Sequence, residues 1–171
     1  MAAFAGLTVT TCFAPFDDTT AAFLKFVKRA KKSVCSSIYG FHLPPLTDGL
    51  IAKHQAGVKV TIILDHTQAE GKAESGEVQK LVDAGVPLLI GTSPIHRQIL
   101  HSKFTIIDGK AVEVGSWNYS LSASQQSNTM TFIEDRAYAK TFVQHWNRIR
   151  SFIILHEMAM QPAGETTPPA A

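Results

Sequence analysis

The chain has 171 residues, of which 45% are hydrophobic and 18% are charged, and its formal net charge is +2. This length is typical of a single domain with a substantial core, and the composition excludes a chain that stays disordered. The charge is too small to identify a nucleic-acid-binding protein, although it would not repel a polyanion.

The apolar start of the sequence lacks the positive charge of a secretory signal, so we expect a cytoplasmic protein. A periplasmic or secreted chain whose signal peptide had been removed would show the same start. No stretch reaches the roughly 18 apolar residues that cross a bilayer, and a soluble protein without a membrane span is expected. Cys12 and Cys35 have neither metal-site nor redox-motif spacing, which favours two buried thiols.

Strand-like and helix-like segments alternate through the first half of the sequence. Residues 7–13 are rich in Thr, Val and Phe and predict a strand that ends at Ala14-Pro15. The spacing that follows predicts a helix to Lys32, capped by one of four residues: Asp17, Asp18, Thr19 or Thr20. The alternation continues with predicted helices at 46–55 and 77–84 and predicted strands at 33–39, 58–64 and 86–90. This order predicts an α/β domain with helices on both faces of a central sheet.

One face of the first predicted helix is strongly basic and carries five cations: Lys25, Lys28, Arg29, Lys31 and Lys32. A basic run of this kind suits contact with nucleic acid. Cations near the end of a helix also interact favourably with its dipole, and a solvated face is the preferred interpretation. The run is therefore only secondary evidence about function.

The second half of the sequence predicts antiparallel strands. Residues 103–107 and 111–114 are apolar, and Asp108-Gly109-Lys110 between them predicts a hairpin. Residues 129–133 predict a last strand, and Asp135 is placed to cap a long helix to about Met158. We therefore expect an α/β fold with a mixed, mostly parallel central sheet, helices on both faces and an antiparallel hairpin.

Residues 1–160 are expected to form this single domain. The remaining residues, 161–171, are rich in proline and offer nothing apolar enough to pack. They predict a disordered tail.

Four polar side chains are predicted to meet at one end of the sheet. His101 and Lys103 are two residues apart on a strand, so they share a face with Cα atoms about 6.6 Å apart. The paired strand runs back and brings Ser116 and Asn118 to the same end. An imidazole, an ammonium, an amide and a hydroxyl there suit a phosphate-binding pocket. None is a carboxylate that would hold magnesium, which favours covalent over metal catalysis and predicts no cofactor.

This segment resembles the HxKxxxxD signature of the phospholipase D superfamily and the G-S-x-N element that follows it. The matching residues are His101, Lys103, Asp108, Gly115, Ser116 and Asn118. Residues 58–65 are also similar to the family's strand before its variable region, and the resemblance covers roughly residues 9–153. With one copy of the motif in a short chain, the sequence is most similar to the small bacterial Nuc-type endonucleases.

The resemblance implies a two-step reaction with a phosphohistidine intermediate. His101 would attack phosphorus, Lys103 and Asn118 would stabilise charge on the phosphoryl oxygens, and a second histidine would protonate the leaving oxygen. Ser116 would be a supporting donor to the phosphate. Because the sequence has one HxK motif, the second histidine would be His101 of another copy, in a two-fold homodimer with the site at its centre.

Asp108 belongs to the motif and is therefore a catalytic candidate. An Asp-Gly pair between two strands is explained at least as well by turn geometry.

One departure from the family concerns its N-x-E-N element, whose Glu hydrogen-bonds the catalytic histidine. Asn128, which is also a candidate for substrate binding, occupies that position here, and Glu134 lies too far along the strand to replace it. An amide can accept the ring N–H but cannot stabilise an imidazolium as a carboxylate does. The rate and the pH optimum are therefore expected to differ.

The weaker candidates for substrate binding have two interpretations each. His96 and Arg97 precede the motif and would line a substrate groove or simply belong to a loop. Trp117 would stack on a base or sugar, or anchor the core. The other five histidines have no metal-ligand spacing and are expected to be ordinary: His42, His54, His66, His145 and His156.

Three functions are compatible with these features. The preferred one is a dimeric nuclease that acts on DNA or RNA, in keeping with the single motif, the short chain and the basic residues. The second is a phospholipase-type phosphodiesterase, although such enzymes usually carry two motifs in a longer chain. The third is a dimer that binds nucleic acid with weak or no cleavage, an alternative that the amide at position 128 leaves open.

Overall fold

The computed structural model describes residues 7–72 and 74–160, so the predicted tail lies outside the described residues. Seven strands of this part form one sheet in the order β1-β9-β7-β6-β2-β4-β5. Their bounds are β1 Thr8–Ala14, β2 Ser33–Ile38, β4 Lys59–Asp65, β5 Leu88–Gly91, β6 Lys103–Ile107, β7 Ala111–Gly115 and β9 Asn128–Glu134. β3 (Phe41–His42) and β8 (Tyr119–Ser120) form a separate parallel pair.

The strand directions confirm a mixed, mostly parallel sheet. β2 pairs in parallel with β4, and β4 with β5, whereas the remaining neighbours are antiparallel. Within the seven-stranded sheet, β6 and β9 therefore run against the other five strands. Each of these two lies between strands of the majority direction, so antiparallel contacts are numerous although most strands point one way.

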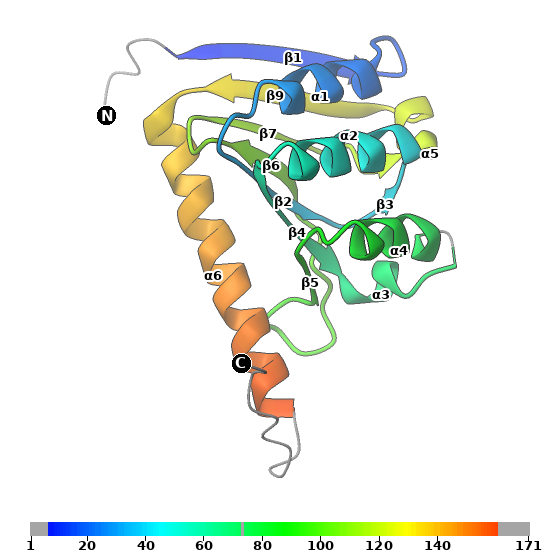
Figure 1. Cartoon of the computed structure of the whole chain (residues 1–171). Coiled ribbons are helices and arrows are strands. Elements are labelled where there is room, and N and C mark those ends of the chain that lie inside the picture. Colours follow the sequence, from blue (N-terminus) through cyan, green and yellow to red (C-terminus); the bar gives the residue numbers. More distant parts are fainter. Residues whose placement is uncertain (1–6, 73, 161–171) are drawn as a thin grey trace.

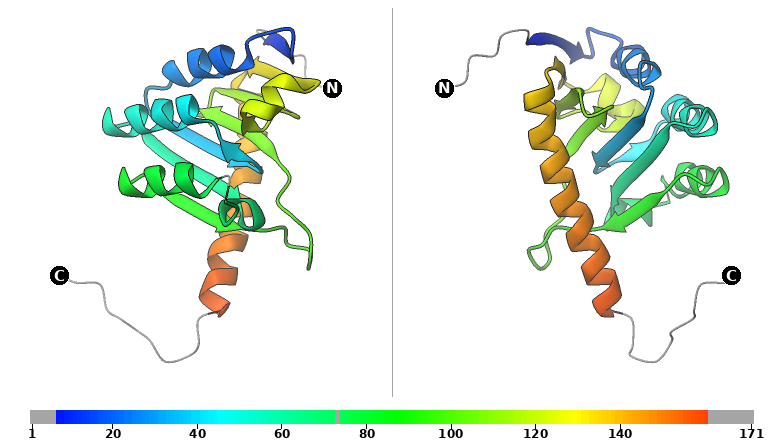
Figure 2. Two further views of the ribbon diagram at one scale, coloured as in Figure 1. Left: turned by 90° about the vertical axis from the view of Figure 1, so that its right-hand side faces the viewer. Right: turned by 60° about the vertical axis from the view of Figure 1, so that its left-hand side comes forward.

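Helices cover both faces of the sheet, as predicted. α1 (Thr19–Lys28), α2 (Pro44–Gln55) and α4 (Ser75–Asp83) form one layer, and α6 (Arg136–Met160) crosses the strands on the opposite face (Figure 1). Figure 2 shows the same three layers from two further directions. The short helices α3 (His66–Ala69) and α5 (Leu121–Gln125) follow directly after β4 and β8.

Two cores result from this layering. The α1, α2 and α4 side contains Phe23, Leu50, Leu81 and Ile62, all almost without exposed area. The α6 side includes Trp146, Ile149, Ile153, Phe104 and Ile106. Because neighbouring residues of a strand point to opposite faces, a sheet with two cores requires strands that are apolar on both sides. Within the described part of the chain, no helix combines the length and the apolar character that a membrane crossing requires.

Side-chain caps start the first and last helices. The carboxylate of Asp18 accepts a hydrogen bond from the Ala21 amide at 2.9 Å, and that of Asp135 accepts one from the Tyr138 amide at 2.6 Å. The predicted extension of α1 to Lys32 is wrong, because the helix ends at Lys28. The amides that would have continued toward β2 donate instead to a carboxylate on a distant turn, described below.

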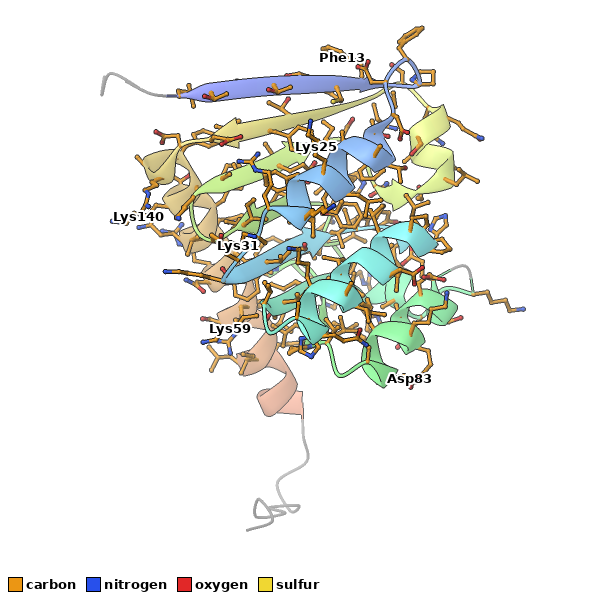
Figure 3. The ribbon with its side chains drawn as sticks, turned by 45° about the horizontal axis from the view of Figure 1, so that its top comes forward. Phe13, Lys25, Lys31, Lys59, Asp83 and Lys140 are labelled. Carbon is orange, nitrogen blue, oxygen red and sulfur yellow. The ribbon has the colours of Figure 1, made fainter. Side chains whose placement is uncertain are left out.

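The basic residues and the cysteines are more exposed than core residues. All five cations of the predicted basic face are exposed, in agreement with a solvated face. Lys25 lies on α1, whereas Lys31 follows the helix, before β2 (Figure 3). Cys12 and Cys35 are free and only partly buried, so the prediction of two buried thiols is confirmed in part.

Candidate active site

His101 and Lys103 lie at the start of β6, where the sheet opens to solvent. Lys103 is the first residue of β6, and its Nζ donates to the carbonyl oxygen of His101 at 2.9 Å. The imidazole of His101 is exposed, whereas the Lys103 side chain is largely buried. Ser102 between them bonds the hydroxyl of Ser37 at 2.6 Å, which fixes the segment to β2. The predicted arrangement of an imidazole beside an ammonium is therefore present.

Tyr39, at the end of β2, contacts both of these residues. Its ring meets the His101 imidazole edge-on, with 4.7 Å between the centroids and 63° between the planes. The Nζ of Lys103 lies 5.2 Å from the centroid of the same ring. A cation over an aromatic face is attracted by the ring quadrupole. The ring of Tyr39 therefore contacts both side chains and keeps the imidazole and the ammonium close together.

Asn118 and Ser116 lie at the same end, after β7. Lys103 is opposite Gly115 in the register of β6 and β7, because Phe104 pairs with Val114. Asn118 Oδ1 accepts a hydrogen bond from the amide of Gly40, the residue after Tyr39, at 3.2 Å. The described residues offer no acceptor bonded to the amide nitrogen of Asn118, which leaves a donor for a ligand oxygen.

Ser116 is fully engaged within the protein. Its hydroxyl donates to Asn128 Oδ1 at 2.9 Å and accepts from the Thr129 amide at 3.0 Å. A Cβ on the preceding Gly115 would collide with the Thr129 carbonyl group, so only glycine allows β7 and β9 to approach this closely here. A hydroxyl has one proton to donate, and donation from Ser116 to a phosphate would require this proton to turn away from Asn128.

The electrostatics of the site favour a neutral imidazole next to a cation. Burial lowers the pKa of His101, the positive charge of Lys103 lowers it further, and the negative charge of Asp65 opposes both. Burial also lowers the pKa of Lys103. A histidine must be unprotonated on one ring nitrogen to attack phosphorus, and a depressed pKa increases that fraction at neutral pH.

Asp108 is not part of this site. It lies at the far end of β6, about 16 Å from Lys103 along the strand. Its carboxylate accepts hydrogen bonds from the amides of Lys31, Lys32 and Ser33 at distances between 2.7 and 3.1 Å. Burial opposes ionisation, but these three bonds lower the pKa of Asp108 overall. The catalytic assignment of Asp108 is therefore corrected to a structural one.

The turn geometry explains why aspartate and glycine occupy this position. Asp108 and Gly109 have φ angles of 53° and 61°, in the left-handed region. Two successive residues with positive φ are typical of the type I′ turn of β-hairpins, for which Asp-Gly is a preferred pair. The carboxylate then ties this turn to the start of β2.

Trp117 does not face a substrate. Its side chain has no exposed area, and its Nε1 donates to Ser124 Oγ at 3.1 Å. The centroid of its ring system lies 5.8 Å from that of Phe23 and 5.5 Å from that of Tyr119. The predicted stacking on a base or sugar is therefore wrong, and the alternative of a core anchor is correct.

Asn128 makes no hydrogen bond to the His101 imidazole among the described residues. Its Oδ1 accepts from Ser116, and its Nδ2 donates to the Ala123 carbonyl oxygen at 2.9 Å. Both ends of the amide are thus engaged away from His101. Asn128 positions Ser116, so its predicted contact with the histidine is corrected to this indirect one.

His96 and Arg97 lie on the exposed loop between β5 and His101. Together with Phe152 and His156 of α6 they line a shallow hollow. A role for them in substrate binding stays a prediction. Elsewhere, the Nδ1 of His42 lies 3.5 Å from the Oε1 of Glu74, and the Nε2 of His66 lies 3.2 Å from the Oε1 of Glu70. Among the described residues, no group of three or more His, Cys, Asp or Glu side chains is arranged to hold a metal.

Sequence reasoning missed three residues near the site, namely Tyr39, Gly40 and Asp65. A signal was present, since Tyr39 and Asp65 stand at the carboxyl ends of two neighbouring parallel strands. The carboxyl ends of parallel strands meet at one edge of a sheet, where ligands commonly bind. The position at the carboxyl ends of parallel strands therefore indicated these residues, whereas the sequence motif did not.

Comparisons with known proteins agree with this geometry. A family described as "Cardiolipin synthase, PLD-like domain" matches residues 23–150. A phospholipase D of Rickettsia prowazekii is 33% identical over 139 residues, which cover 81% of this chain and 65% of that protein. A mitochondrial cardiolipin hydrolase of Xenopus tropicalis is 29% identical over 142 residues, which cover 81% of this chain and 65% of that protein. The chain thus spans less than two thirds of the length of these two relatives.

Two solved structures have the same fold. The phospholipase D family member Nuc from Salmonella typhimurium superposes with a TM-score of 0.77 at 27% identity and covers 83% of this chain and 93% of its own. NucT from Helicobacter pylori gives a TM-score of 0.76 at 19% identity, covers 85% of this chain and 96% of its own, and is a likeness in fold alone. Since the family match covers most of the described residues and includes His101, Lys103 and Asn118, this chain belongs to the phospholipase D superfamily.

Proposed function

We propose that this chain is a phosphodiesterase that cleaves nucleic acid, DNA or RNA, through a covalent histidine intermediate and without a metal ion. One observation carries the proposal. An exposed imidazole with a lowered pKa lies beside a buried ammonium and a free amide donor, all at the open end of the sheet. This set provides a nucleophile and two groups that stabilise negative charge.

The reaction follows from these groups. A neutral nitrogen of His101 attacks phosphorus, and the bond from phosphorus to the leaving oxygen breaks as that oxygen takes up a proton. Lys103 and the amide nitrogen of Asn118 stabilise the charge on the non-bridging oxygens. Water then attacks the phosphohistidine, the phosphorus–nitrogen bond breaks, and the imidazole is regenerated together with a phosphomonoester.

The leaving oxygen needs a proton donor in addition to the nucleophile and the two groups that stabilise charge. The chain has a single HxK motif, so the acid proposed is His101 of a second copy in a two-fold homodimer. A two-fold axis at the open end of the sheet would bring two identical imidazoles to the two sides of one phosphodiester. The second histidine would then also act as the base that activates water.

Nucleic acid is preferred as the substrate because the motif residues resemble those of the Nuc-type endonucleases. The Salmonella typhimurium protein Nuc, which shares this fold, is 27% identical to this chain. The basic run supports the choice only weakly. Lys31 and Lys32 lie next to the Asp108 turn, at the end of β6 opposite to His101.

A lipid phosphodiester is the second candidate. The names of the relatives, phospholipase D and mitochondrial cardiolipin hydrolase, favour it. A third candidate, binding without efficient cleavage, follows from the amide at position 128, which makes no bond to His101.

Cleavage assays in excess EDTA distinguish these candidates. Wild-type protein and the His101→Ala variant would be incubated with labelled single- and double-stranded DNA and RNA, and in parallel with cardiolipin and phosphatidylcholine vesicles. Both proteins would also pass through size-exclusion chromatography. We expect a wild-type dimer that cleaves nucleic acid, and no cleavage by the variant.

Other results would contradict the proposal in different ways. Cleavage of lipid alone would replace the substrate. Binding of nucleic acid without cleavage would favour the third candidate, and cleavage that needs added metal would exclude the covalent mechanism.

A further inference from the structure

We propose that the corner between β4 and α3 positions the catalytic histidine, with Asp65 as its central residue and Gln68 as its second arm. We assign neither residue a contact with the substrate. Asp65 ends β4 and has no exposed area, and Gln68 lies on the short helix α3. The inference rests on the proposed chemistry at His101 and assigns these two residues to it as positioning residues.

The carboxylate of Asp65 connects α3 to the backbone next to the nucleophile. Its Oδ2 accepts a hydrogen bond from the amide of Leu100 at 2.7 Å, and its Oδ1 accepts one from the amide of Thr67 at 3.0 Å. Leu100 directly precedes His101, and its side chain is buried in the α6-side core. One carboxylate therefore fixes the main chain just before the histidine in a water-free position, where a hydrogen bond to a charged acceptor is strong.

The second arm fixes the ring that touches both catalytic side chains. Gln68 Nε2 donates to the hydroxyl oxygen of Tyr39 at 2.9 Å. Tyr39 in turn packs against the imidazole of His101 and lies under the ammonium of Lys103. The corner thus fixes His101 in two ways. Asp65 fixes the backbone next to it, and Gln68 fixes the Tyr39 ring that packs against its imidazole.

The charge of Asp65 also acts on the imidazole. The charged groups that influence the pKa of His101 are the ammonium of Lys103 and the carboxylate of Asp65, while the ring of Tyr39 contacts the imidazole edge-on. Burial and Lys103 lower the pKa of His101, whereas Asp65 raises it. Glu74 is a further buried carboxylate near Asp65, and it accepts a hydrogen bond from the Phe41 amide.

This opposition fits a residue with two roles. In a two-fold dimer the same histidine serves as the neutral nucleophile in one copy and as the protonated acid in the other. An acid–base group works best when its pKa lies near the working pH. A carboxylate that offsets the effects of burial and of the lysine keeps the imidazolium accessible without forming a direct ion pair.

NMR titration of the His101 ring in the full-length protein tests the charge effect without any assay of activity. We expect Asp65→Asn to lower the pKa of His101 relative to wild type. Asp48→Asn, which removes an exposed carboxylate on α2, is the matched control and should leave the titration unchanged. A folded Asp65→Asn protein with an unchanged or raised His101 pKa would overturn the inference.

A double-mutant cycle tests the second arm and does not depend on the folding of the Asp65 variant. Gln68→Leu and Tyr39→Phe each remove one side of the same hydrogen bond, and both side chains are only partly buried. We expect each to reduce kcat on the order of ten- to a hundredfold with little change in KM, because a small displacement of a catalytic group is costly. The double variant should be no worse than either single one.

The outcomes separate this inference from the proposed function. Strictly additive losses in the cycle, or losses confined to KM, would overturn the positioning role. A wild-type protein that cleaves no phosphodiester would contradict the proposed function, and the titration would still decide whether Asp65 acts on His101.

Discussion

The two ends of the β6–β7 hairpin carry residues of one sequence motif but differ in how their polar groups are bonded. At the open end, the His101 imidazole is exposed, and within the described residues Lys103 donates to one carbonyl oxygen. At the turn end, the Asp108 carboxylate accepts from three backbone amides. Groups with unused donors can bind a ligand, whereas fully bonded groups maintain the fold. The shared motif therefore contains one part that maintains the fold and one part to which we assign the proposed chemistry.

The largest expected effect breaks the open end. His101→Ala removes the nucleophile and should reduce kcat by a factor of about 10⁴ or more, and Lys103→Met by about 10²–10³ through lost charge stabilisation. Thermal unfolding should show little change for His101→Ala because the imidazole is exposed. Single-turnover cleavage of the preferred substrate measures both variants. A His101→Ala protein with near wild-type kcat would show that another residue attacks phosphorus.

The turn end should respond in the opposite manner. Asp108→Ala leaves three backbone amides without their acceptor and removes a side chain suited to positive φ, so we expect a loss of about 2–3 kcal/mol in the free energy of unfolding. The kcat of the folded fraction should stay within about threefold of wild type. Urea unfolding and cleavage measured on one preparation provide both quantities. A large drop in kcat with unchanged stability would return Asp108 to the catalytic groups.

Glu113, in the middle of the β6–β7 hairpin, is expected to make the free energy of unfolding depend on pH. Glu113 of β7 is buried opposite Thr105 of β6, and both its carboxylate oxygens are without a hydrogen-bond partner among the described residues. Burial raises its pKa well above the usual value. The folded state therefore retains a proton that the unfolded state releases, so stability is complete below the unfolded pKa and is lost as pH rises toward the folded one.

Glu113→Gln tests this dependence because the amide does not titrate. We expect the variant to lose less stability than wild type between about pH 5 and pH 8, in urea titrations repeated along the pH range. The control is Asp48→Asn, which removes an exposed carboxylate of α2 and should leave the slope unchanged. Parallel curves for wild type and Glu113→Gln would show that this carboxyl group is not the source of the slope.

The smallest expected effect concerns the orientation of Ser116. Asn128→Ala removes the acceptor of its hydroxyl proton and should lower kcat by only a few-fold, with stability reduced by about 1 kcal/mol. Ser116→Ala, which removes the same hydrogen bond from its other side, should produce a loss of similar size. Steady-state kinetics with urea unfolding measures both. A much larger loss for Asn128→Ala than for Ser116→Ala would indicate that the amide acts on the reaction directly.

Element types and the meeting point of the proposed catalytic residues followed from local patterns. The alternation of segments predicted both helical layers, and the two-residue period of a strand with a tight Asp-Gly turn placed His101, Lys103 and Asn118 at one end of the hairpin. These inferences succeeded because strand period and turn geometry depend on neighbours in the chain.

The errors arose where a distant residue supplied the partner. α1 ends early because Asp108 captures the amides that follow it, from 75 to 77 positions away. Trp117 turns inward because Phe23 of α1 packs against it, and Asp65 reaches the nucleophile through an amide 35 positions later in the chain. The sequence alone thus determined that His101, Lys103 and Asn118 meet at one end of the hairpin, since local geometry is encoded by adjacent residues. The assignment of each group to chemistry or to support depended on long-range packing, which no local pattern contains.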